Sequence, residues 1–150
     1  MVAASLMVAC SGVQDPYHKR LTPVAAVPAA PTAVVDIPGL LNLSIDELSR
    51  PLGPPRPIPA GFVDPTLSVR SQTLDSTTLF QHHGLSIIAS YDYRTRRVSD
   101  LLLLGSDENR LMSAAQLQLG ADRYLVLPVF EARRPTQLLG LRVLAVLPGQ

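Results

Sequence analysis

Proline is distributed unevenly along this chain of 150 residues, and the distribution limits where a packed domain can form. Eleven of the fourteen prolines fall between Pro16 and Pro65, and only three follow. Proline lacks a backbone N–H and fixes φ, so a proline-dense stretch disfavours helix interiors and central strands. We therefore expect the packed part of the chain to lie mainly after residue 65.

The composition fits one domain with a substantial core, because 47% of the residues are hydrophobic and 17% are charged. The net charge of +1 gives no electrostatic reason to expect nucleic acid as a partner. A single cysteine excludes an internal disulfide, and no Cys/His cluster has zinc-binding spacing, so we predict neither a metal site nor a cofactor. No apolar run approaches the roughly 20 residues of a membrane-spanning helix.

A short helix is predicted after Leu43. Ser44 and Glu47 have the spacing of a capping box, in which each side chain accepts a hydrogen bond from the other residue's backbone. Pro51 limits this helix to one or two turns. Its apolar face consists of Ile45, Leu48 and Leu52.

The second half of the chain alternates between strand and helix patterns. We predict strands over 77–84, 84–93 and 98–104, and two more over 123–132 and 138–147. Pro128 lies within the fourth strand and is therefore expected at an edge or a bulge. Between these groups, a helix is predicted from the cap Ser106 to Gly120. Its apolar stripe consists of Leu111, Met112, Ala115 and Leu119.

These elements predict an α+β fold. The short connections favour an antiparallel sheet of about five strands, with a short N-terminal helix and one longer helix packed on one face.

The stretch Met7-Val8-Ala9-Cys10 resembles a bacterial lipobox, the cleavage site of lipoproteins. This resemblance implies cleavage before Cys10 and diacylation of its thiol. Only nine residues precede Cys10 and none is basic, so we expect a basic segment upstream of Met1. The alternative is an apolar N-terminus with a free or buried cysteine.

Residues after Cys10 have the composition of a linker, rich in Ala, Val and Pro and without helical or strand periodicity. We therefore divide the chain into three parts. Residues 1–10 form a truncated-looking signal and lipobox, residues 11–38 a disordered tether, and residues 39–150 a single small domain.

The segments LSIDELSRPLGPP and TLFQHHGLSIIASYDYRTRRVSDLLLL resemble small outer-membrane lipoproteins of the SmpA/OmlA type, and also uncharacterised bacterial lipoproteins. The shared order is a helix ending in Leu-Gly-x-Pro followed by a hairpin with an aromatic strand. The resemblance covers residues 39–104. It implies a periplasm-facing accessory or binding role without catalysis, and it carries over no partner or contact residue.

Few side chains suggest chemistry. His82 and His83 are neighbours near a strand end, and neighbouring strand residues face opposite ways, so a shared metal is not expected. Ser86 or Ser90 could be combined with His83 and Asp92 into a triad, but no G-x-S-x-G motif supports one, and we predict no catalytic residues.

The two arginine pairs, Arg96-Arg97 and Arg133-Arg134, fall in predicted hairpin turns. Solvated turn residues are the simplest interpretation. The functional alternative is that both pairs share one end of the sheet and contact lipid headgroups or an acidic partner. The aromatic residues Tyr91, Tyr93, Tyr124 and Phe130 are expected in the core or on the sheet surface. The alternative is a partner site, which would leave some of them exposed as a patch.

The sequence therefore favours a bacterial envelope protein, anchored through Cys10 at the outer membrane and facing the periplasm. Its expected role is binding or scaffolding, with the membrane and an envelope protein as partners. The alternative is a soluble domain that binds a small ligand or acts as an enzyme, with a disordered N-terminus.

Overall fold

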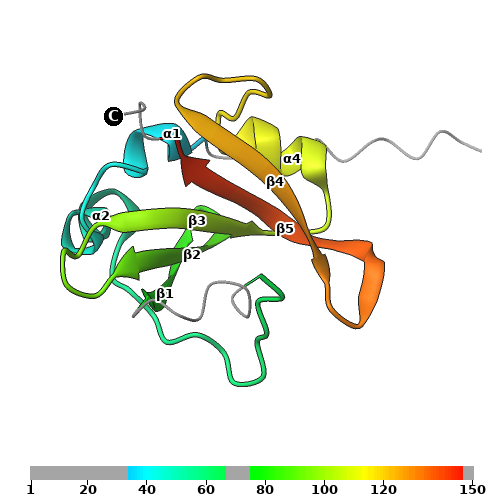
Figure 1. The fold of residues 1–150 in the computed structure, drawn as a ribbon, viewed down its shortest axis with the longest axis horizontal. Coiled ribbons are helices and arrows are strands. Elements are labelled where there is room, and N and C mark those ends of the chain that lie inside the picture. The colour runs from blue at the N-terminus through cyan, green and yellow to red at the C-terminus, as the bar shows by residue number, and fades with distance from the viewer. Residues whose placement is uncertain (1–33, 67–74, 147–150) are drawn as a thin grey trace, which may run out of the picture. The chain divides into compact units, whose positions relative to one another are not determined.

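The chain forms a five-stranded antiparallel sheet with helices on one side (Figure 1). A computed structural model describes residues 34–66 and 75–146, so Cys10 and residues 11–33 of the expected tether lie outside the described residues. The elements follow in the order α1 (Ile37–Leu40), α2 (Ile45–Leu52), β1 (Asp75–His82), β2 (Leu85–Asp92), β3 (Val98–Leu104), α4 (Glu108–Ala114), β4 (Tyr124–Glu131) and β5 (Arg134–Ala145). This arrangement confirms the expected α+β fold and its five-stranded antiparallel sheet.

The last strand is inserted into the middle of the sheet, because the strand order is β1-β2-β3-β5-β4. β4 is therefore an edge strand that pairs with β5 alone. The N–H of Val146 donates to the carbonyl of Arg123 at 3.0 Å, and alternate residues of an antiparallel strand bond to the same neighbour. By this alternation the nitrogen of Pro128 faces the free edge, as expected for proline in a sheet.

Helix α2 confirms its sequence signals. The N–H of Glu47 donates to Ser44 Oγ at 3.3 Å, and the N–H of Ser44 donates to Glu47 Oε2 at 2.8 Å. Pro51 is tolerated because it lies in the last turn, and the chain leaves the helix at Gly53, whose φ is +87°. The expected apolar face is buried and consists of Ile45, Leu48 and Leu52.

Helix α4 is shorter than predicted. Its N-cap is Asp107, which accepts a hydrogen bond from the N–H of Arg110 at 3.0 Å, and not Ser106. The helix ends at Ala114 because Gln116 takes a left-handed conformation with φ +53°. The chain then leaves the helix axis, so Leu117 is buried while Leu119 is 73% exposed. Placing Leu119 on the apolar stripe was therefore wrong.

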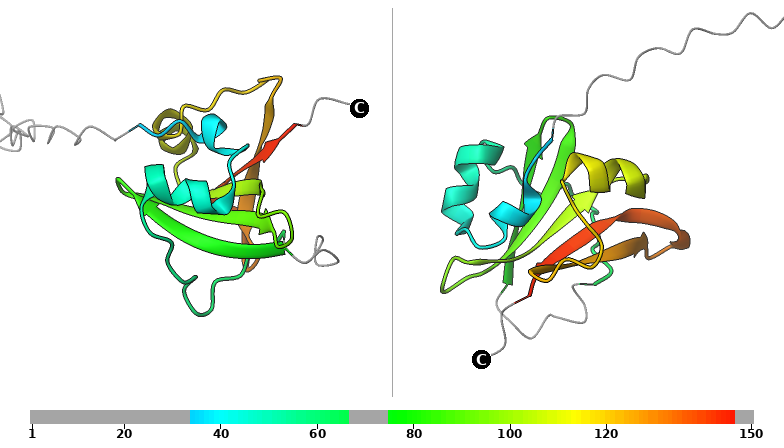
Figure 2. Two further views of the ribbon diagram at one scale, coloured as in Figure 1. Left: turned by 90° about the vertical axis from the view of Figure 1, so that its left-hand side faces the viewer. Right: turned by 90° about the horizontal axis from the view of Figure 1, so that it is seen from above.

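The two faces of the sheet are covered by different kinds of structure (Figure 2). Successive side chains of a strand alternate between faces, so Leu101 and Leu103 of β3 face the helices while Leu102 faces the opposite side. We call the first side the helical face. It contacts buried residues of α1, α2 and α4, among them Ile37, Leu48, Leu52, Leu111 and Ala114.

The opposite side, which we call the second face, is covered by residues 53–66, the covering segment. Ile58 and Phe62 of this segment pack on a small cluster of buried strand residues, which are Leu79, Ile88, Leu102 and Val129. Five prolines, which are Pro54, Pro55, Pro57, Pro59 and Pro65, remove N–H groups from the segment. Its backbone pairs with the sheet at Arg56, whose N–H donates to the carbonyl of Leu79 at 2.7 Å.

Candidate functional site

A buried ionic network lies on the second face. Arg142 of β5, only 3% exposed, donates through Nη1 to Asp100 Oδ1 of β3 at 3.0 Å. Its Nη2 donates to Asp64 Oδ2 of the covering segment. Two hydroxyls also donate to Asp100, from Ser90 at 3.2 Å and from Ser99 at 3.2 Å. The network therefore ties the covering segment to β3 and β5.

This network is a structural feature rather than an open reaction site. Its charges are hydrogen-bonded to one another and shielded from solvent, and the Nε of Arg142 is its one buried side-chain atom without a hydrogen bond among the described residues. Asp64 also accepts from the N–H of Thr66 at 2.9 Å and from its hydroxyl at 2.7 Å. These bonds form a turn that fixes the direction in which Asp64 reaches the sheet.

Sequence reasoning did not identify this network. Asp64 and Arg142 are 78 residues apart, and nothing in the local pattern pairs them. The available signal was Arg142 itself, a charged residue inside the apolar run Leu138–Leu147. A charge in a predicted central strand requires a buried partner.

The hairpin formed by β4 and β5 extends beyond the rest of the sheet. β3 pairs with β5 only from Gly140 to Leu144, so residues 134–138 have β4 as their strand partner. Figure 1 shows this end of the hairpin projecting away from β3. Exposed apolar side chains occur along β4, at Leu125, Leu127 and Phe130. The edge strand therefore exposes more apolar surface than a half-buried strand requires.

The structure separates the two arginine pairs that the functional alternative placed together. β3 and β5 are antiparallel, with Asp100 opposite Leu144 and Leu104 opposite Gly140. The turn with Arg96 and Arg97 precedes Val98 at one end of β3, whereas Arg133 and Arg134 lie beyond Leu104 at the other end. The prediction that both pairs share one end of the sheet is therefore wrong. The insertion of β5 between β3 and β4 places the two hairpin turns at opposite ends of the sheet.

Arg96 is bound within the domain. Its Nε donates to Asp46 Oδ2 at 3.2 Å, and its Nη2 contacts the other oxygen of the same carboxylate. This hydrogen bonding lowers the pKa of Asp46 and raises the pKa of Arg96 from their ordinary values. The guanidinium also lies over the ring of Tyr91, 5.3 Å from its centroid.

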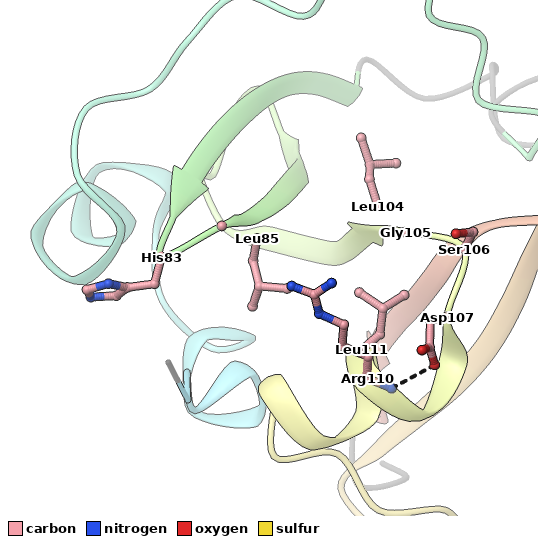
Figure 3. A pocket seen from close by; sticks show the side chains of 9 residues that line it. His83, Leu85, Leu104, Gly105, Ser106, Asp107, Arg110 and Leu111 are labelled. Carbon is pink, nitrogen blue, oxygen red and sulfur yellow. Dashed lines mark hydrogen bonds between the residues drawn. The ribbon is translucent and has the colours of Figure 1, made fainter. Parts of the chain in front are cut away.

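A surface cavity of about 250 Å³ lies between the β1–β2 turn and the start of α4 (Figure 3). The side chain of Arg110 extends into it, while the imidazole of His83 points away. Asp107 also lines the cavity but is engaged as the helix cap. Small-molecule sites typically occupy about 300–1,000 Å³, so this cavity is small for a ligand site.

The serine, histidine and aspartate residues considered as a possible catalytic triad do not lie together. Ser90 donates to Asp100, and Asp92 accepts from the N–H groups of Arg94 and Thr95. Those backbone bonds, led by the one from Thr95, lower the pKa of Asp92. His83 and Ser86 lie at the opposite end of β2 from Asp92.

The two histidines contact each other edge to face, with ring centroids 4.1 Å apart. His82 ends β1 and His83 stands in the turn with φ +46°. Burial, and secondarily the charge of His83, lowers the pKa of His82. Among residues 34–66 and 75–146, no group of three or more His, Cys, Asp or Glu side chains could hold a metal ion.

The aromatic residues divide between core and surface. Tyr91 and Tyr124 pack against the core of the helical face, and the hydroxyl of Tyr124 accepts from the N–H of Gln118 at 2.9 Å. Tyr93 and Phe130 are exposed. The prediction of core or sheet-surface positions therefore holds for the first pair, and Phe130 belongs to the exposed surface of the β4–β5 hairpin.

Comparison with protein-family models, with curated proteins and with solved structures finds no match for this chain. Within the described residues, no helix is long and apolar enough to cross a membrane.

Proposed function

We propose that this protein is a lipid-anchored component of the bacterial cell envelope, at the outer membrane and facing the periplasm, with a binding or scaffolding role and no catalysis. The observation that carries the proposal is the lipobox-like stretch Met7-Val8-Ala9-Cys10 followed by the Pro/Ala-rich residues 11–38. Acyl chains on Cys10 would provide the anchor. Each buried CH₂ contributes about 0.8 kcal/mol, so several chains give stable attachment.

The composition of residues 11–33 supports a tether, whereas residues 34–38 belong to the domain, because Val35 and Ile37 are buried in its core. Extended proline-rich chain advances about 3 Å per residue, so this stretch is long enough to hold a domain tens of ångströms from a bilayer. A binding domain benefits from such reach, because it can meet partners that are fixed elsewhere in the envelope.

The surface of the domain supports binding rather than turnover. Exposed apolar residues along the edge strand β4 are typical of contact surfaces, and the cavity beside Arg110 is small. The alternative, a soluble domain for a small ligand, has that cavity as its supporting observation.

Membrane fractionation tests the proposal. The native protein should remain in the membrane pellet after washing with alkaline carbonate, whereas Cys10→Ser should move to the soluble fraction. Ser11→Ala, which keeps the thiol, serves as the matched control and should stay in the pellet. Equal fractionation of the native protein and Cys10→Ser would contradict the anchor and favour the soluble alternative.

A further inference from the structure

We propose that the tip of the β4–β5 hairpin, together with the neighbouring loop 61–63, binds the surface of an anionic lipid bilayer. The inference rests on the proposed function, because a tether would hold the domain close to such a surface. This end of the sheet combines a protruding shape, exposed apolar side chains and exposed arginines.

The shape is a protruding tip. Glu131 pairs with Arg134 across a two-residue turn, Ala132 and Arg133. β3 ends before this region, so the tip extends beyond the sheet, and all residues from 132 to 136 are exposed. A protruding tip can reach a flat surface without rearrangement of the core.

Apolar side chains are exposed beside the tip. Phe130 is 43% exposed, and Val63 in the adjacent loop is 66% exposed. The loop and the hairpin together line an open groove of about 410 Å³, with Phe62 and Val63 on one side and Ala132 and Arg133 on the other. The side chains of Phe130 and Val63 would enter the boundary between headgroups and acyl chains.

Cations surround the apolar residues. Arg133 forms no ion pair within the described parts of the chain, and the side chain of Arg134 remains 65% exposed although it bonds to Glu131 at 2.9 Å. Exposed apolar side chains beside arginine match an anionic bilayer, where the aliphatic stems lie in the interface and the charges meet headgroups.

At the opposite end of the sheet, the positive charges are offset by an equal number of carboxylates. Arg94, Arg96 and Arg97 stand there beside three carboxylates, Asp46, Glu47 and Asp92. Arg96 is paired with Asp46, and the carboxylates offset the remaining positive charge. This turn is therefore a matched control for the hairpin tip.

Vesicle cosedimentation with the full-length chain carrying Cys10→Ser tests the proposal without any acyl anchor. The probes are vesicles of equal phosphatidylglycerol and phosphatidylcholine, and vesicles of phosphatidylcholine alone. We expect at least tenfold stronger binding to the anionic vesicles. Arg133→Gln with Arg134→Gln should reduce that binding about tenfold, because each basic residue near an anionic surface contributes substantially.

The apolar contribution is tested by Phe130→Ser with Val63→Ser, which should also reduce binding several-fold. The control variant Arg94→Gln with Arg97→Gln should bind within about twofold of the parent chain. Both hairpin substitutions change exposed side chains, and circular dichroism checks that each variant remains folded.

Equal losses in the hairpin and control variants would overturn the proposal, since binding would then follow total charge. Binding that soluble polyglutamate abolishes, and that the Phe130 and Val63 changes leave unaltered, would assign the arginines to an acidic polypeptide instead. Because Cys10 is replaced throughout, failure here leaves the anchor proposal standing, and failure of the anchor leaves this result standing.

Discussion

The two faces of the sheet are stabilised in different ways. The helical face buries a large apolar cluster against α1, α2 and α4, whereas the second face buries a small one under a proline-rich segment without regular structure. At the centre of the second face, Arg142 binds Asp64 and Asp100. The comparison indicates that apolar packing holds the helical face, while the cover of the second face is fixed by the ionic network together with the backbone bridge at Arg56.

The difference follows from backbone chemistry. Helices satisfy their own N–H and C=O groups and so can present a continuous apolar stripe to a sheet. A segment with five prolines cannot do so, and its described backbone contact with β1 is the bridge at Arg56. The side-chain hydrogen bonds of Asp64 therefore hold the covering segment against the sheet, as a ladder of backbone hydrogen bonds would otherwise do.

The largest expected effect comes from Arg142→Met. This change leaves two buried carboxylates without their cation, and breaking a buried pair from one side typically costs about 3–5 kcal/mol. Urea unfolding measures the loss. A cost under about 1 kcal/mol would show that the network does not hold the second face.

A triple variant provides the control for that prediction. Arg142→Met with Asp64→Leu and Asp100→Leu removes all three charges, and apolar replacement of a buried ionic network is often close to neutral. We expect it to recover at least half of the stability lost in Arg142→Met.

Two neighbouring leucines of β3 allow the helical face and the second face to be compared at positions of equal burial. Leu101 and Leu102 are both 0% exposed but face opposite sides of the sheet. Leu101→Ala should cost about 4 kcal/mol, because packed helices cannot close the cavity. Leu102→Ala should cost about 2–3 kcal/mol, since the covering segment can move inward. Urea unfolding of the two variants should rank them in this order, and the reverse order would contradict the account.

The N-cap of α2 should contribute less to the free energy of unfolding than either buried leucine. Ser44→Ala removes the side-chain acceptor for the N–H of Glu47, and loss of such a cap costs about 1 kcal/mol. Thermal unfolding measures the change. Ser44→Asp keeps an acceptor at this position and should retain most of the stability, so an equal loss in both variants would argue against a capping role.

The smallest effect is expected at Asp46. The hydrogen bond from Arg96 lowers its folded-state pKa, so the folded state binds fewer protons than the unfolded state. Its contribution is therefore present above the unfolded pKa of about 3.9 and is lost as pH falls through the folded pKa. In Asp46→Asn, the free energy of unfolding should therefore fall slightly less steeply as the pH is lowered through the acid range. Because the pair is exposed, we expect the difference to shrink in about 1 M salt.

A double-mutant cycle with Arg96→Gln checks this assignment. The two changes together should cost no more than either alone, within error, if the pair acts as a unit. Additive costs would show that the two side chains act independently.

Local signals predicted much of the fold. The capping box at Ser44, the apolar spacing of α2 and the edge position of Pro128 are all properties of short segments, and each is found as expected. The early end of α4 was missed because Gln116 takes a left-handed conformation that Gly120 was expected to supply.

Long-range features could not be read from the sequence. The insertion of β5 between β3 and β4 separates the arginine turns, and no local pattern specifies which strand a final hairpin pairs with. The bond between Asp64 and Arg142 depends on the same insertion, because it places Arg142 beside Asp100 in the middle of the sheet.

The proposed membrane anchor at Cys10 can be tested by measuring the intact mass of the native protein from separated membrane and soluble fractions. The account predicts a membrane species that begins at Cys10 and carries diacylglycerol and an N-acyl chain. An unmodified species that begins at Met1 in the soluble fraction would contradict it.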